Sequence, residues 1–195
     1  MAKKYIKNFY YRDQKALLAV SRCGYVSHAH LKNFVADSRI KNYVRDGYMI
    51  KETVTKANGE VLEGYKLTKV GRDFVAREYG FKDHYHAQSL NHDLGVANKY
   101  FSLTEQERET WKTETQLRNE FEEKLNQLYK VDYERYNEIR EQLDKKEISM
   151  PDCSYISEHV EIAFEVVTNN YSQQELDAKE RYIEITKMTY ETERR

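Results

Sequence analysis

Residues 27–67 read SHAHLKNFVADSRIKNYVRDGYMIKETVTKANGEVLEGYKL, and this stretch predicts how the first half of the chain folds. Ser27 is a favoured N-cap residue, so it predicts a short helix directly after it. Residues 39–45 form a second helix after a turn. Residues 48–56 and 61–67 are rich in β-branched and aromatic residues and are joined by an Asn-Gly dipeptide, a strong hairpin signal. The pattern predicts a helix-turn-helix followed by a β-ribbon wing.

The second predicted helix has an apolar and a polar side. Ile40, Tyr43 and Val44 share one face, and Asp37 or Ser38 is expected to cap the helix. The opposite side carries cations that suit phosphates and polar groups that can reach base edges. These candidate DNA-binding residues are Ser38, Arg39, Lys41, Asn42 and Arg45 on the helix, with Lys51 and Lys56 on the wing.

The charge distribution favours a nucleic-acid partner for this half. Residues 1–90 carry 17 Lys and Arg against 9 Asp and Glu, whereas residues 91–195 carry 15 against 24. A basic front half is expected where a domain meets a polyanion. The alternative is that the same scaffold serves protein contacts.

Composition predicts a folded protein of the cytosol. The chain has 195 residues, 39% of them hydrophobic, with 17 Tyr and 7 Phe, which is more bulk than disordered chains carry. It has no run of about 18 apolar residues and no signal-peptide core, so neither a membrane partner nor secretion is expected. The two cysteines, Cys23 and Cys153, have no metal-site spacing and are expected to be free thiols.

The flanking sequence predicts two domains in an α+β fold. A helix at 13–21 ends at Gly24, and a second helix runs from Thr68, its cap, to Gly80. We therefore expect an N-terminal winged helix-turn-helix domain over 1–80, a linker over 81–95 and a small α/β domain over 96–195. The expected elements of the rear domain are a strand at 110–117, one long helix at 119–146, paired strands at 153–156 and 160–168, and a helix at 172–185.

Two acidic residues of the rear domain have the outline of a nuclease core. Pro151-Asp152 precedes one predicted strand and Glu165 lies on the next, so the two carboxylates would converge on a divalent ion that activates water. Glu114, on the strand predicted before them, would be a third ligand. The position two residues after Glu165 is Val167, where this pattern has a lysine that handles water.

Taken together, the chain resembles the replication-relaxation family of bacterial plasmids and integrative elements, which combines a winged helix with a restriction-endonuclease-like domain. The motifs that carry the resemblance are Asn91-His92-Asp93-Leu94, Glu114-x-x-Leu117-Arg118, Pro151-Asp152 and Ala163-Phe164-Glu165-Val166-Val167-Thr168. The resemblance implies that Asp152 and Glu165, with Glu114, are positioned as ligands of Mg²⁺ or Mn²⁺. The missing lysine implies a degenerate core, unless residues such as Lys179 or Lys187 replace it.

These observations predict a sequence-specific double-stranded DNA-binding protein of a mobile element, accessory to its transfer, mobilization or replication. Its partners would be duplex DNA, a relaxase or another transfer or replication protein, and a second copy of the chain. DNA binding itself needs no cofactor. The alternatives are a metal-dependent DNA-nicking enzyme and a winged-helix transcriptional repressor.

Overall fold

The computed structural model describes residues 4–195 and has a mixed α+β fold. The chain divides into two compact units, residues 1–103 and 104–195. The predicted linker 81–95 and the helix α5 (Leu90–Ser102) therefore belong to the front unit. The boundary lies after Leu103. The charge asymmetry persists at this boundary, with 18 basic and 10 acidic residues in the front unit against 14 and 23 in the rear unit.

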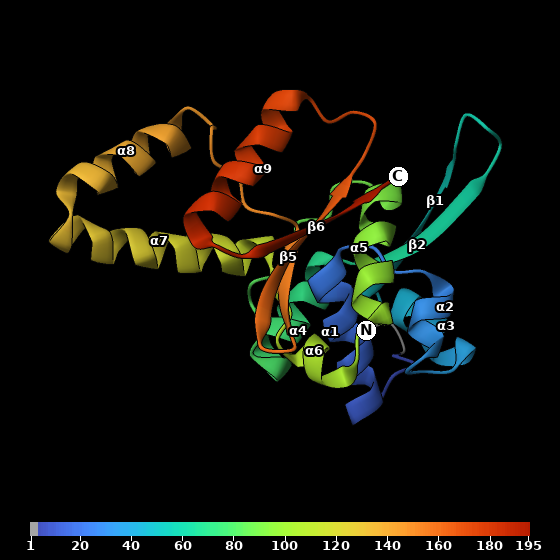
Figure 1. The fold of residues 1–195 in the computed structure, drawn as a ribbon. Helices are drawn as coiled ribbons and strands as arrows, with labels where there is room; N and C mark the ends of the chain where they lie inside the picture. Colours follow the sequence, from blue (N-terminus) through green and yellow to red (C-terminus); the bar gives the residue numbers. More distant parts are fainter. Residues whose placement is uncertain (1–3) are drawn as a thin grey trace. The chain divides into compact units, whose positions relative to one another are not determined.

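The front unit is built from helices and one antiparallel ribbon (Figure 1). In chain order its elements are α1 (Tyr11–Cys23), α2 (His28–Lys32), α3 (Asp37–Arg45), β1 (Met49–Thr55), β2 (Val61–Leu67), α4 (Lys69–Tyr79) and α5 (Leu90–Ser102). The ribbon pairs Met49 with Leu67 and Thr55 with Val61, and its tip projects beyond the helices of this unit. The helices and strands predicted for residues 13–79 are thus confirmed as elements.

Local capping explains where these helices begin and end. The side chains of Ser27 and Thr68 accept hydrogen bonds from the backbone of His30 and Gly71, as expected for N-caps. Gly80 ends α4 in the left-handed conformation, which costs glycine little.

Two details of the predicted front unit are wrong. Helix α3 begins at Asp37 with Ala36 at the N-cap, because the Asp37 carboxylate bonds to His28 Nε2 at 2.8 Å instead of capping. Val44 lies at the exposed edge of the apolar face, whereas Ile40 and Tyr43 are buried.

The rear unit combines a four-stranded sheet with α-helices (Figure 1). Its elements are α6 (Glu105–Glu109), β3 (Lys112–Thr113), α7 (Glu114–Val131), α8 (Tyr133–Asp144), β4 (Cys153–Ser157), β5 (Val160–Val167), α9 (Gln173–Thr186) and β6 (Thr189–Arg194). The strand order is β3-β4-β5-β6. The first three strands are antiparallel, and β6 is parallel to β5 because α9 carries the chain back across the sheet.

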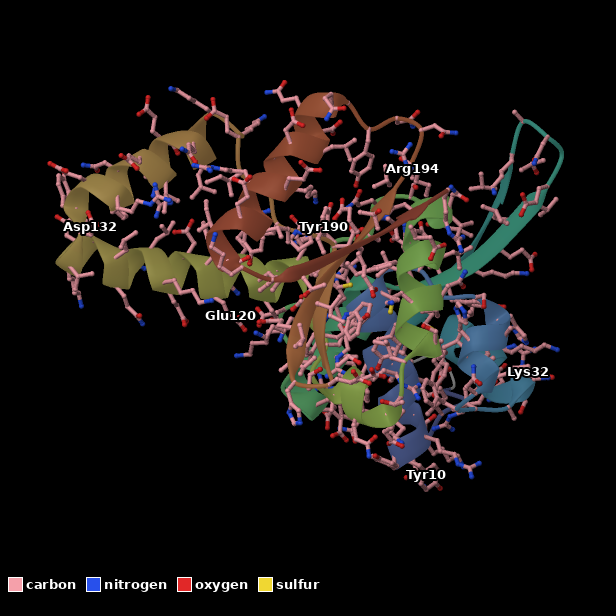
Figure 2. All side chains as sticks on the ribbon, in the orientation of Figure 1. Tyr10, Lys32, Glu120, Asp132, Tyr190 and Arg194 are labelled. Carbon is pink, nitrogen blue, oxygen red and sulfur yellow. The ribbon has the colours of Figure 1, made fainter. Side chains whose placement is uncertain are left out.

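The predictions for residues 110–146 are corrected in two places. Only Lys112–Thr113 is a strand, because Thr113 caps α7 and the helix starts at Glu114. The predicted long helix is two helices that break at Asp132, which caps α8 and lies at the bend in Figure 2. Helix α8 folds back on α7, as the 2.7 Å ion pair between Arg140 and Glu122 shows.

One apolar stripe nevertheless runs through both helices. It packs with the loop between α8 and β4 and with α9 into a single cluster. The buried members are Leu117, Phe121, Leu125, Ile139, Ile148, Met150 and Tyr182. The predicted apolar stripe is therefore confirmed as a buried helical face, but it is divided between two helices that pack against each other.

Cys23 and Cys153 are both fully buried free thiols, one in each unit. Burial raises the pKa of the Cys23 thiol well above its ordinary value. Within residues 4–195, every helix is too short or too polar to cross a lipid bilayer.

Candidate functional site

Helix α3 presents part of the predicted DNA-binding set to solvent. The apolar side chains of Ile40 and Tyr43 anchor it, and Ser38, Lys41 and Arg45 are exposed on its other side. Asn42 is half-buried. The Arg45 guanidinium lies 5.2 Å from the ring centre of Tyr5, an exposed stacking contact that leaves its charge available. These side chains suit contacts with both phosphates and base edges.

Arg39 does not lie with them. Its Nε and Nη2 atoms donate to the two carboxylate oxygens of Asp13 at 2.6 and 2.7 Å, and only 22% of its side chain is exposed. The Tyr43 hydroxyl also donates to Asp13, and Arg39 Nη2 donates to the carbonyl of Asn8. Arg39, one of the predicted DNA-binding residues, thus ties α3 to α1 through a bidentate pair with a buried carboxylate.

The two wing lysines occupy exposed ion pairs on the ribbon. Lys51 Nζ lies 2.7 Å from Glu63 on the opposite strand, and Lys56 Nζ lies 3.0 Å from Glu60 across the turn. Exposed pairs of this kind contribute little to stability. Both lysines can therefore exchange their carboxylate for a phosphate at small cost.

The rear unit brings Asp152 and Glu165 together as predicted. Glu165 Oε2 accepts the backbone N–H of Asp152 at 2.8 Å, and Asp152 Oδ2 accepts the backbone N–H of Val166 at 2.8 Å. Both carboxylates are fully buried. The cluster is therefore built by reciprocal bonds between the start of β4 and strand β5.

Helix α9 supplies the cation that the strand lacks. Lys179 Nζ lies 3.1 Å from Glu165 Oε1 and donates to the carbonyl of Met150 at 2.5 Å. Tyr171 donates its hydroxyl to the same Glu165 oxygen at 2.7 Å. Lys179 thus stands beside Glu165 in place of the lysine that Val167 cannot provide, and we call Asp152, Glu165, Lys179 and Tyr171 the rear cluster.

The rear cluster brings two carboxylates close together. Both are fully buried, and the Lys179 ammonium group pairs with Glu165. Burial and the charge of Asp152 raise the pKa of Glu165, Lys179 and Tyr171 oppose the rise, and the net pKa is about 7. A proton on the pair at neutral pH would relieve the repulsion between the two carboxylates.

Glu114, the predicted third ligand, is not part of the rear cluster. It is the first residue of α7 rather than a strand residue, and its carboxylate pairs with Arg118 at 2.6 Å. Only its backbone N–H reaches the cluster, donating to the carbonyl of Asp152 at 3.0 Å. The helix start at Glu114 turns the side chain toward the next turn, where Arg118 lies.

The residues present do not fit a divalent ion in this arrangement. A hard cation takes six or more oxygen ligands, several of them from water. Here the two buried carboxylates bond to backbone N–H groups, and an ammonium group occupies the position beside Glu165. Within residues 4–195, no group of three or more His, Cys, Asp and Glu side chains is arranged to hold a metal ion.

Comparison with models of known protein families finds no match, and comparisons with curated proteins and with solved structures find none either. The family resemblance of the sequence therefore stays a prediction.

Proposed function

We propose that this protein binds double-stranded DNA sequence-specifically, with the front unit as a winged helix whose α3 enters the major groove. In this proposal it serves a plasmid or integrative element as an accessory factor in transfer, mobilization or replication. The observation that carries the proposal is the exposed polar side of α3, with Ser38, Lys41 and Arg45 held outward by the buried Ile40 and Tyr43.

Three features support a polyanionic partner. The front unit has an excess of eight basic residues. The ribbon that follows α3 carries Lys51 and Lys56 in weak exposed pairs, where a phosphate can replace the carboxylate. Helix α3 is fixed to its unit through Arg39 and Asp13, which holds the proposed reading side chains on a rigid element.

The test is the affinity of α3 variants for DNA. Lys41→Ala and Arg45→Ala should each weaken binding in a gel-shift assay with a duplex selected from a random pool. A base-reading residue should cost about 1 to 3 kcal/mol and relax the preferred sequence. A phosphate-binding residue should weaken all duplexes alike and lower the salt slope by about one.

The matched control is Lys124→Ala, which removes an exposed lysine from α7 in the rear unit. If both α3 variants bind every duplex as tightly as the control does, α3 is not the DNA reader. Shortening the turn at 57–60 should lower affinity without changing the preferred sequence, because the wing is proposed to contact the backbone.

A second candidate function is DNA nicking, and one observation favours it. Lys179 meets Glu165 beside Asp152, so the rear cluster contains the three residue types of the nuclease pattern. Against it stand the burial of both carboxylates and the backbone N–H group that each of them already accepts. We therefore expect no cleavage of supercoiled plasmid with either Mg²⁺ or Mn²⁺.

That expectation has a direct test in the Asp152→Ala variant. Wild-type protein and variant are incubated with plasmid and each metal, and nicked circles are quantified. Metal-dependent nicking that disappears in Asp152→Ala would establish the rear unit as a nuclease.

A further inference from the structure

Two cavities open beside the start of α1 in the front unit, and both are lined by Tyr11. The first has a volume of about 500 Å³ and the second about 560 Å³. Both lie within the range that small-molecule sites in proteins occupy. Their linings differ in a way that points to one kind of ligand.

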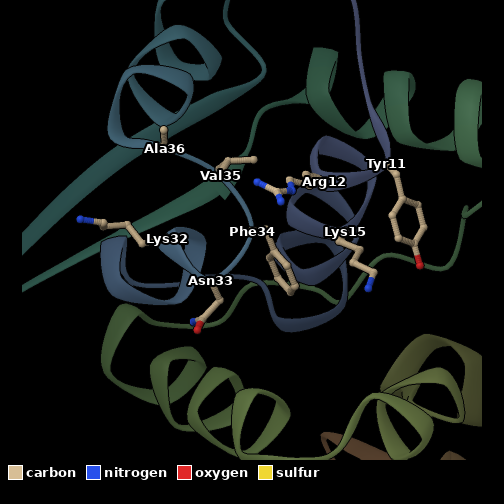
Figure 3. Close-up of a pocket in the computed structure, with 8 residues that line it drawn as sticks. All are labelled: Tyr11, Arg12, Lys15, Lys32, Asn33, Phe34, Val35 and Ala36. Atoms are coloured by element: carbon tan, nitrogen blue, oxygen red, sulfur yellow. The ribbon is translucent and has the colours of Figure 1, made fainter.

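The first cavity is cationic. Arg12 and Lys15 project from α1 near Phe34 (Figure 3). Lys32 extends away from them on α2, where its ammonium group lies 3.6 Å from the Asp37 carboxylate. None of its lining residues is acidic. Asp13, the next residue after Arg12, is turned away into its pair with Arg39. The cavity therefore has the charge and shape to accept a phosphate group.

The second cavity is aromatic. Its lining includes Phe9, Tyr10, Tyr11, Phe74 and Tyr79. Its one lining carboxylate, Glu78, is paired with Arg77 at 2.7 Å. Five rings around one cavity offer the stacking surfaces that nucleobases use.

Two adjacent tyrosines at these cavities are open to solvent: Tyr11 lines both cavities and Tyr10 lines the second. Tyr10 and Tyr11 are each 66% exposed, and Lys15 Nζ lies 4.7 Å from the ring centre of Tyr11, which limits the movement of that ring. A core role does not explain two adjacent exposed rings on a well-packed helix. A ligand that stacks on them does.

We propose that the two cavities together bind an unpaired nucleotide, with its phosphate beside Arg12 and Lys15 and its base against the aromatic lining. A base inside a duplex is covered on both faces by its neighbours, so it cannot stack on Tyr11. This site is therefore separate from the duplex contact proposed for α3. The nucleotide is either part of a single strand or free, and the shared chemistry is a phosphate next to an accessible base.

The experiment uses the full chain and a fluorescein-labelled oligothymidylate of about ten nucleotides, which cannot pair with itself. Fluorescence anisotropy should show binding. Tyr11→Ala should weaken it about tenfold, because loss of one stacking platform costs roughly that much. Arg12→Ala should weaken it and reduce the salt slope by about one.

Two matched variants serve as controls. Tyr133→Ala removes a tyrosine that is 58% exposed in the rear unit, and Lys124→Ala removes an exposed lysine there. Both should bind the oligonucleotide like the wild type. Displacement by free thymidine monophosphate identifies a free nucleotide as the ligand, and displacement by unlabelled oligonucleotide alone identifies a strand.

The proposal is overturned if neither probe binds, or if Tyr11→Ala binds as tightly as Tyr133→Ala. Its failure is separable from failure of the proposed duplex binding. Lys41→Ala and Arg45→Ala should weaken duplex binding and leave oligothymidylate binding unchanged, and Tyr11→Ala should do the reverse.

Discussion

Each unit of this protein buries a cluster of charged side chains, and the two clusters balance their charges differently. In the front unit, Asp13 meets one guanidinium group and one hydroxyl group, so a single negative charge meets a single positive charge. In the rear unit two carboxylates lie together: Glu165 pairs with Lys179 and accepts the backbone N–H of Asp152. The front cluster is a structural tie between two helices. The rear cluster contains a carboxyl group with a raised pKa, and perturbed pKa values are more typical of functional sites.

The largest effect is expected at the cation of the rear cluster. Lys179→Met removes the ammonium group that pairs with the buried Glu165, which should lower the free energy of unfolding by about 3 to 5 kcal/mol. Urea denaturation followed by Trp111 fluorescence reports on this unit, because Trp111 is buried in it and is the only tryptophan of the chain. The control Lys124→Met should unfold like the wild type. A loss below about 1 kcal/mol would mean that water reaches the carboxylates and that the cluster is open.

A pH dependence should separate the two clusters next. The raised pKa of Glu165, about 7, lets the folded rear unit keep a proton that the unfolded chain releases above about pH 4.5. The stabilisation is therefore fully present below that pH and is lost as pH rises through 7. The change is on the order of 3 kcal/mol.

Glu165→Gln should flatten this dependence in urea titrations between about pH 5 and pH 8. The exposed Glu134→Gln on α8 is the matched control and should keep the wild-type slope. A rear unit whose stability rises over that range would contradict the assigned charge state.

A smaller effect is expected in the front cluster. Asp13→Asn keeps the shape of the side chain but removes the charge that holds Arg39, which should cost about 2 kcal/mol. Thermal denaturation followed by circular dichroism measures the loss, with the exposed Asp73→Asn as the control. The comparison fails if Asp13→Asn is as stable as Asp73→Asn.

The smallest effect is expected at Glu114. Glu114→Gln removes one i,i+4 pair with Arg118, which contributes about 0.3 to 0.5 kcal/mol. The variant should leave the pH dependence of the rear unit intact, since its carboxylate lies outside the rear cluster. If Glu114→Gln flattens that dependence as Glu165→Gln does, Glu114 belongs to the cluster after all.

The sequence predicted what depends on neighbouring residues. Ser27 and Thr68 cap their helices and Asn58-Gly59 turns the ribbon, because caps and tight turns are decided within three or four residues.

The sequence could not predict what depends on distant partners. Arg39 carries the same signal as Lys41 and Arg45, and only Asp13, 26 residues earlier, turns it inward. The break at Asp132 was hidden because the apolar stripe continues through it, and each half of the stripe packs into the same cluster. Lys179 and Lys187 were both candidates to replace the missing lysine, and only the path of α9 across the sheet selects Lys179.

The two buried thiols allow the opening rate of each unit to be measured separately. A thiol reagent cannot reach Cys23 or Cys153 in the native state, so modification waits until the surrounding unit opens. Mass spectrometry of the peptides that contain Cys23 and Cys153 would give one opening rate for each unit, without any engineered label. The rates would show whether a variant in one unit loosens that unit alone or both together.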